Sequence, residues 1–268
     1  MIYVIFFLVG TTASVIGAIS GIGGGVIIKP LLDAFSTFDS TVIGLISAFS
    51  VLTMSVTSVI RHAVKRTTFD GKATVFLGIG AVLGGIAGDF LFGLIKSAGD
   101  DSVVKLAQCS ALILLLCFVL IYMNVIRKKS QSSLHVTNFA LTILIGMTLG
   151  IISTFIGIGG GPINIAVLCL FFGMDIKSAT INSLVLIIFS QSAKILKTAV
   201  AGTFAVINMP WGIVACMAIG AVIGGLLGTY INLKIDGKKI LWVYNGTLLF
   251  IIAINIYTIV NSIVAMTV

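Results

Sequence analysis

Long apolar runs separated by short polar connections make up most of this chain. Each run is about 20 residues long, the length that an α-helix needs to cross a hydrocarbon core of ~30 Å. The runs also lack the polar face that a helix of a soluble bundle would carry. There are eight of them, at 2–20, 41–60, 73–95, 105–126, 138–156, 179–200, 211–231 and 241–262. The pattern predicts an all-α, polytopic membrane protein with eight main transmembrane helices.

Two glycine-rich breaks interrupt this pattern. Gly-Ile-Gly-Gly-Gly occurs at Gly21–Gly25 and again at Gly157–Gly161, each time directly after an apolar run. Glycine lacks a Cβ and adopts positive φ readily, so such a break can end a helix and turn the chain. We expect a short helix after each break, over 26–38 and 162–173. With a rise of 1.5 Å per residue, each would span ~20 Å and could not cross the bilayer alone.

The breaks belong to a longer internal repeat. The two pentapeptides lie 136 residues apart, and at the same offset Ser47 aligns with Ser183. Further along, the offset is 140, and two glycine-striped segments align, IGAVLGGIAGDF at 79–90 and IGAVIGGLLGTY at 219–230. Glycines spaced four residues apart let helix backbones approach closely. We predict two homologous halves, 1–130 and 131–268.

The relative orientation of the two halves depends on whether each short helix is counted as a further element that crosses the membrane. Four crossings in each half would make the repeats parallel, whereas a fifth element would invert the second half. Lys and Arg accumulate in cytoplasmic loops, and the basic clusters are Arg61–Lys72, Arg127–Lys129 and Lys234–Lys239. The inverted scheme places all three on one side of the membrane, whereas the parallel scheme separates the third. We favour inverted repeats, with parallel repeats as the alternative.

Composition and charge serve mainly to exclude other classes of protein. Apolar residues make up 59% of the chain and charged residues 9%, against about a quarter charged in soluble domains. The net charge of +8 lies mostly in a few connections, which favours membrane orientation over nucleic-acid binding. The four cysteines form no CxxC pair, and an HExxH motif is absent. We expect no enzyme activity, no metal and no cofactor. The first run, 2–20, contains no Lys or Arg, so we expect it to be part of the mature protein rather than a cleaved signal peptide.

The glycine breaks could bind an anion. A helix that begins after a glycine turn presents free N–H groups and the positive end of its dipole. If the repeat brings the two breaks together, they would frame one central site. The alternative is a structural kink that merely requires small residues. The candidate backbone contacts are Gly21, Gly23, Gly24 and Gly25 of the first break, and Gly157, Gly159, Gly160 and Gly161 of the second.

Polar side chains inside apolar runs are costly in lipid and therefore mark candidate functional positions. In the run 179–200, Ser183, Gln191 and Lys194 fall broadly on one helical face. We expect Lys194 to balance the charge of an anionic solute. Ser47, Asn182, Ser183 and Gln191 would donate hydrogen bonds to it.

Several other polar residues are weaker candidates because the repeat does not match them. Lys29 has Ile165 as its counterpart, and Asn164 is likewise unmatched. Lys197 is expected to extend its ammonium to the membrane interface. Asp89 is expected to cap an interface rather than carry protons.

The breaks, once in each half of a duplicated eight-span chain, resemble the TauE/SafE sulfite-exporter family (TSUP permeases). The resemblance covers essentially the whole chain and is carried by 21–32, by 157–168 and by the glycine-striped helix of each half. The second break departs from the family pattern, because Pro162 follows it directly whereas family copies often place the proline later, as Pro30 does. Contacts made by the second half could therefore differ in detail from those of other members.

The resemblance implies a secondary transporter, a permease or exporter, in a bacterial cell membrane. The expected partners are the lipid bilayer and a small anionic solute such as sulfite, a sulfonate or thiosulfate. Association into a homo-oligomer is left open, and nucleic acid is not an expected partner. Other readings are a transporter of a different small anion or metabolite, a passive anion channel, and a membrane scaffold that moves no solute.

Overall fold

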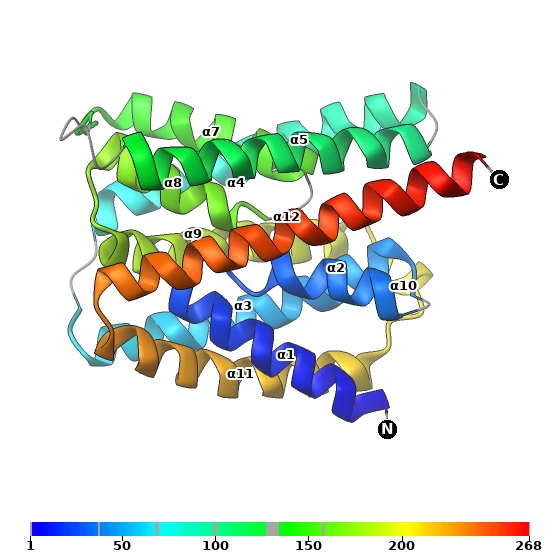
Figure 1. Cartoon of the computed structure of the whole chain (residues 1–268), viewed down its shortest axis with the longest axis horizontal. Helices are drawn as coiled ribbons and strands as arrows, with labels where there is room; N and C mark the ends of the chain where they lie inside the picture. The colour runs from blue at the N-terminus through cyan, green and yellow to red at the C-terminus, as the bar shows by residue number, and fades with distance from the viewer. Residues whose placement is uncertain are drawn as a thin grey trace.

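The computed structural model describes residues 2–36, 38–67, 70–98, 101–126, 134–156 and 159–267. Within these residues the chain is helical, without a strand (Figure 1). The helices are α1 (Ile2–Ser20), α2 (Gly25–Phe35), α3 (Ser40–Val64), α4 (Gly71–Ala98), α5 (Asp101–Ile121), α7 (Phe139–Ile156), α8 (Gly161–Phe172), α9 (Ile176–Val200), α10 (Thr203–Val206), α11 (Trp211–Lys234) and α12 (Gly237–Thr267), with a π-helical turn, Tyr122–Ile126, after α5.

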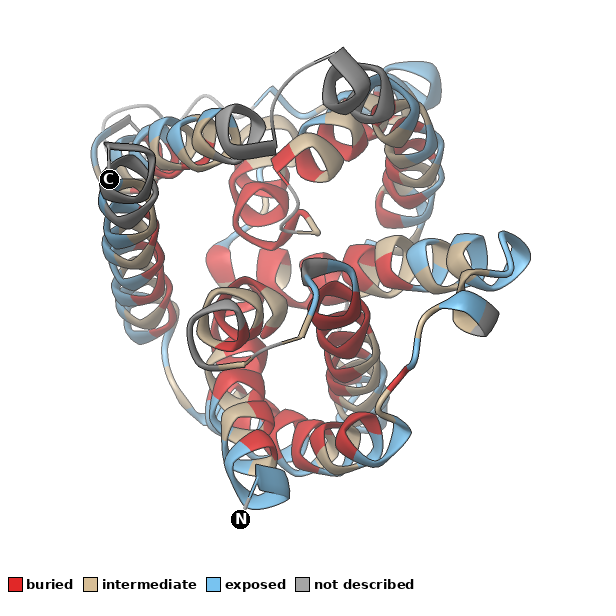
Figure 2. Cartoon of the chain, turned by 90° about the vertical axis from the view of Figure 1, so that its right-hand side faces the viewer, coloured by how far each residue is buried: buried red, intermediate tan, exposed pale blue. Residues whose placement is uncertain are grey.

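Eight of the described helices are long and apolar enough to cross a bilayer, and they coincide with the eight predicted runs. The all-α, multi-pass membrane fold is therefore confirmed. Viewed along the helices, exposed positions lie on the perimeter and buried positions on the faces turned inward (Figure 2). Large apolar side chains such as Leu114 and Ile219 are exposed on the outside, as lipid contact requires.

The two short helices confirm the prediction made from the glycine breaks. Helices α2 and α8 begin at Gly25 and Gly161, immediately where the glycine runs end. Gly160 has a positive φ of 85°, and Pro162 occupies the first turn of α8, where its missing N–H leaves no bond unmade. The four-residue helix α10 was not predicted. It follows Gly202, whose φ is also positive, and it is too short to give a periodic signal.

Helix α9, which carries most of the polar candidates, begins at a side-chain cap. The carboxylate of Asp175 accepts hydrogen bonds from the backbone N–H groups of Lys177 and Ser178. Partial burial disfavours the carboxylate, but the hydroxyl of Ser178 and these N–H groups outweigh it and hold the pKa of Asp175 below its ordinary value. The cap therefore keeps its charge at neutral pH and fixes the start of α9.

Backbone contacts join helix α4 to helix α7. A Cβ added at Gly80 would overlap the carbonyl oxygen of Ile143, and one added at Gly84 would overlap that of Met147. In return, Gly146 of α7 lies against the carbonyl of Leu77 on α4. Each helix thus needs glycine where the other approaches, as in small-residue packing between membrane helices.

The second glycine-striped helix, α11, repeats this arrangement against α1. Gly220 and Gly224 lie against the carbonyls of Phe7 and Thr11. These carbonyl positions precede those contacted on α7 by 136 residues, which is the offset of the sequence repeat. Helix α1, near the N-terminus, therefore packs on α11, near the C-terminus, and α7 packs on α4.

Contacts at the helix ends give the direction of several helices. The ring of Tyr3 lies against Gly212, so α1 and α11 begin side by side. The ammonium of Lys177 donates to the carbonyls of Leu233 at 3.2 Å and Ile235 at 3.3 Å, so α9 begins where α11 ends. Both labelled chain ends lie at the same end of the bundle (Figure 1).

We predict that Gly84→Ala and Gly224→Ala each destabilise the protein by ~1–3 kcal/mol, because the new methyl group would overlap the carbonyl oxygen of Met147 or Thr11. Thermal unfolding in detergent micelles measures the effect. Gly246→Ala on α12 is the matched control, because no atom lies within 4 Å of the added Cβ. A Gly84→Ala protein as stable as the Gly246→Ala protein would contradict the packing described.

Candidate functional site

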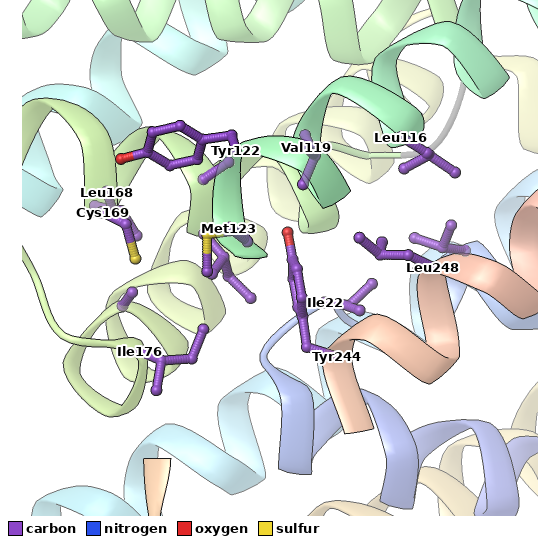
Figure 3. Close-up of a cluster of buried hydrophobic side chains, with 14 of the residues drawn as sticks. Ile22, Leu116, Val119, Tyr122, Met123, Leu168, Cys169, Ile176, Tyr244 and Leu248 are labelled. Atoms are coloured by element: carbon purple, nitrogen blue, oxygen red, sulfur yellow. The ribbon is translucent and has the colours of Figure 1, made fainter. Parts of the chain in front are cut away.

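The two glycine breaks touch each other. Gly161, at the start of α8, lies against the carbonyl of Ile22 in the first break, so closely that any Cβ there would overlap it. The side chain of Ile22 is buried in a cluster formed mainly by the second half of the chain, alongside Tyr244 and Leu248 (Figure 3). The first break is therefore inserted into the core that surrounds the second.

Side chains from neighbouring helices hold both breaks in place. The hydroxyl of Ser183 on α9 donates to the carbonyl of Gly21 at 2.7 Å. The fully buried hydroxyl of Tyr244 on α12 donates to the carbonyl of Pro162 at 2.7 Å. The first bond pairs a carbonyl that lies beyond the end of α1, and the second adds a side-chain donor to a carbonyl in the first turn of α8.

A cavity of about 690 Å³ lies between the breaks. Its volume is in the range typical of small-molecule sites. It reaches from the glycine turns to the end of α9 at Ala201, and much of its wall is aliphatic. Its polar lining side chains are Lys29, Ser47, Asp89, Ser153, Thr154, Asn164, Ser190, Gln191, Lys194, Lys197, Thr198 and Thr203.

The charged lining residues carry a positive excess. Lys197 forms an ion pair with Asp89 at 2.6 Å, joining α9 to α4 at the partly exposed edge of the cavity. Lys194 donates to the carbonyl of Gly44 on α3 at 2.9 Å. Lys29 also lines the cavity, and Asp89 is the sole carboxylate among the described lining residues. With Asp89 paired to Lys197, the two remaining ammonium groups leave a potential that favours anions.

The second break presents neutral polar groups to the same cavity. The Oγ of Ser153 and the Oδ1 of Asn164 are buried and have no hydrogen-bond partner. A Cβ added at Gly160 would lie 2.9 Å from each of these oxygens, and one added at Gly159 would overlap the amide of Gln191. A side chain at either position would overlap these polar groups, so both positions require glycine.

The structure brings about half of the predicted site residues to the cavity. Those that line it are Gly23, Gly25, Ser47, Gly159, Gly160, Gln191 and Lys194. Gly21, Gly24, Gly161, Asn182 and Ser183 support the surrounding structure without lining it, and Gly157 lies outside the described residues. Asn182, for example, accepts from the hydroxyl of Thr74 at 2.5 Å and donates to the carbonyl of Ser178 at 2.8 Å. Solute binding by any of these residues stays a prediction.

Lys29, Asn164 and Asp89 are weaker candidates in the sequence, and Ser153 is not a candidate there. All four line the cavity. Their common signal is a mismatch in the repeat, because each stands opposite a residue without the same polar group. Lys197, which is expected to extend to the interface, forms an ion pair with Asp89, and both side chains are partly exposed.

Removing the hydroxyl of Tyr244 tests how strongly α12 supports the second break. Tyr244→Phe removes the hydrogen bond to the Pro162 carbonyl, and we predict a destabilisation of ~0.5–1.5 kcal/mol in thermal unfolding. Tyr257→Phe is the control on the same helix, because Tyr257 is 64% exposed. Equal unfolding temperatures for the two variants would show that the Tyr244 bond adds no stability.

Comparison with known proteins relates the whole chain to membrane transporters. The family model described as "Sulfite exporter TauE/SafE" matches residues 6–256. The chain is 24% identical over 271 residues to the probable membrane transporter protein YunE of Bacillus subtilis (strain 168), which covers 94% of this chain and 96% of that protein. It is 26% identical over 247 residues to the probable membrane transporter protein MJ0441 of Methanocaldococcus jannaschii, with 88% of each chain covered. No solved structure gives a significant match.

Proposed function

The chain belongs to the TauE/SafE sulfite exporter family and is a multi-pass membrane transporter, and we propose that its solute is a small sulfur-containing anion, sulfite or an organosulfonate, bound between the two glycine breaks. The observation that carries this proposal is the cavity itself. Both breaks line it, and it holds Lys29 and Lys194 without a second carboxylate among the described lining residues. The name of the family supports sulfur as the central atom.

The balance of polar groups suits an anion that must be released as well as bound. Lys194 donates one of its three N–H groups to the carbonyl of Gly44, which holds the ammonium in place and leaves two donors for a solute. Neutral donors at Ser47 and Gln191, together with the glycine backbone, can complete the coordination of the oxygens. A site built mainly from neutral donors holds an oxyanion less tightly than several fixed cations would.

We further propose that the two halves are inverted repeats. Helix α1 begins beside the start of α11, whereas α9 begins beside the end of α11. The backbone N–H of Val136, just before α7, bonds to Phe171 at the end of α8, so α7 begins at the end of the bundle where α9 begins. The helices α1 and α7 are equivalent in the repeat and start at opposite ends. The positive-inside rule then assigns the loops at Lys72 and Lys238 to the cytoplasm, and Ala201, which lines the cavity just after α9, to the outer side.

This topology predicts which loops react from which side. In a variant without the native cysteines, Lys72→Cys and Lys238→Cys should react with a membrane-impermeant maleimide only from the cytoplasmic face, because both lie on the basic side. Ala201→Cys should react only from outside. Labelling of Lys238→Cys from outside would instead favour parallel repeats.

The role of the lysine charge can be tested by transport in proteoliposomes. Lys194→Gln should lower the flux of radiolabelled sulfite about tenfold, because a hydrogen bond to a charged group contributes ~1.5–3 kcal/mol. Lys238→Gln is the matched control, because it removes an exposed cation that does not line the cavity.

The rival functions give different results in the same assay. Unchanged anion flux in Lys194→Gln would remove the charge role, and transport of a neutral or cationic metabolite would replace the proposed solute class. Conductance without coupling to a gradient would identify a passive channel. If no anion moved faster than through empty vesicles, the proposal would fail and a scaffold would remain.

A further inference from the structure

Several polar residues of the cavity are not conserved between the two copies of the sequence repeat, although the helices around the cavity follow that repeat. At the offset of 136 residues, the counterparts of Lys29, Ser153, Asn164, Gln191 and Lys194 are Ile165, Gly17, Ile28, Ser55 and Ser58. The backbone elements are duplicated, but these side chains are not. A solute in the cavity therefore meets a chemically different surface on each side.

One side of the cavity is cationic. Lys29 lies on α2, and Lys194 reaches across from α9 to the carbonyl of Gly44 on α3. Ser47 on α3 adds a hydroxyl close to Gly25, where an added Cβ would lie 3.2 Å from its Oγ. The ammonium groups therefore gather around α2 and α3. This is the side that can bind an anionic head group.

The other side is neutral and has unmet hydrogen bonds. Ser153 and Asn164 are 7% and 2% exposed, and both line the cavity. The Oγ of Ser153 and the Oδ1 of Asn164 have no partner, although a buried polar atom without a hydrogen bond is costly. Both oxygens lie beside Gly160, each 2.9 Å from the position that a Cβ on that residue would take. The site thus offers one hydroxyl donor and one amide acceptor to a bound group.

A deprotonated oxyanion cannot satisfy this pair, because all its oxygens are acceptors and the Asn164 Oδ1 needs a donor. A hydroxyl group can, since it donates to the Oδ1 of Asn164 while accepting from the hydroxyl of Ser153. The amide of Gln191, packed over Gly159, lies next to the same space. The cavity volume of about 690 Å³ also exceeds what a bare sulfite ion would fill.

We propose that Ser153 and Asn164 form a specificity subsite for a hydroxyl group at the far end of an organosulfonate whose sulfonate lies near Lys29 and Lys194. This inference rests on the proposed function, in which the cavity binds sulfur-containing anions. It goes further by naming the solute class, hydroxyalkyl sulfonates, and the residues that recognise the hydroxyl.

Two sulfonates that differ by one hydroxyl test the subsite without any mutation. In proteoliposomes with the wild-type protein, 2-hydroxyethanesulfonate should be transported with about tenfold higher efficiency than ethanesulfonate. Ethanesulfonate lacks the hydroxyl group and therefore leaves the buried polar atoms of Ser153 and Asn164 unpaired. Equal efficiencies would mean that water alone occupies the subsite, and would overturn the inference while leaving the transport of sulfonates intact.

Variants then assign the preference to residues. Ser153→Ala and Asn164→Leu should each reduce the preference for the hydroxylated sulfonate toward equality. Ser50→Ala is the matched control, because Ser50 also has a buried hydroxyl without a partner but does not line the cavity, and it should keep the wild-type preference. If Ser153→Ala kept the full preference as well, the subsite would be wrongly placed.

Failure of the proposed hydroxyl subsite can be distinguished from failure of the proposed transport function. Transport of neither sulfonate nor sulfite by the wild-type protein would overturn the proposed function itself. Lys194→Gln separates the two sides of the cavity, because it should lower the transport of both sulfonates together and leave their ratio near the wild-type value. A ratio that collapsed in Lys194→Gln would contradict the division into a cationic and a neutral side.

Discussion

A contact between backbone atoms alone joins the two glycine breaks at the centre of this protein. Gly161 lies directly on the carbonyl of Ile22, and no larger residue could stand there. Because each break ends a helix inside a membrane-spanning region, its free backbone groups must face protein or a cavity rather than lipid. The contact places the two breaks side by side, so one cavity serves both. The fixing bonds from Ser183 and Tyr244 then orient the turns around it.

Close backbone contacts at glycine also build the frame of helices around the cavity. Glycine stripes on α4 and α11 let α7 and α1 approach to backbone distance. Such contacts have little room for adjustment, so we expect the pairs α4–α7 and α1–α11 to behave as rigid units in transport. The ion pair between Lys197 and Asp89 is partly exposed and lies where α9 meets α4. It is easier to break than the glycine contacts, which makes this edge of the cavity the more adjustable one.

The sequence repeat and the positions that depart from it have different consequences here. The repeated glycines and helices produce the frame, and the unmatched residues within it produce the chemistry. Lys29 and Lys194 give one side a positive charge, while Ser153 and Asn164 give the other side neutral, unpaired groups. A symmetric cavity would suit a small symmetric ion. An asymmetric one suits a solute with two different ends, which connects the proposed transport of sulfonates to the proposed hydroxyl subsite.

The sequence alone determined the eight spans and the two short helices, because the thickness of the bilayer and the conformational freedom of glycine act locally along the chain. It also pointed to Lys194 and Gln191, which share one face of α9. Only the tertiary structure decided which polar groups reach the cavity. Asn182 and Ser183 lie on the same helix, yet they bond to Thr74, Ser178 and the carbonyl of Gly21, whereas Ser153, from a plain apolar run, lines the cavity. Helical periodicity gives the face of a residue but not the neighbour that face meets, and the neighbour is fixed by packing between segments distant in the chain.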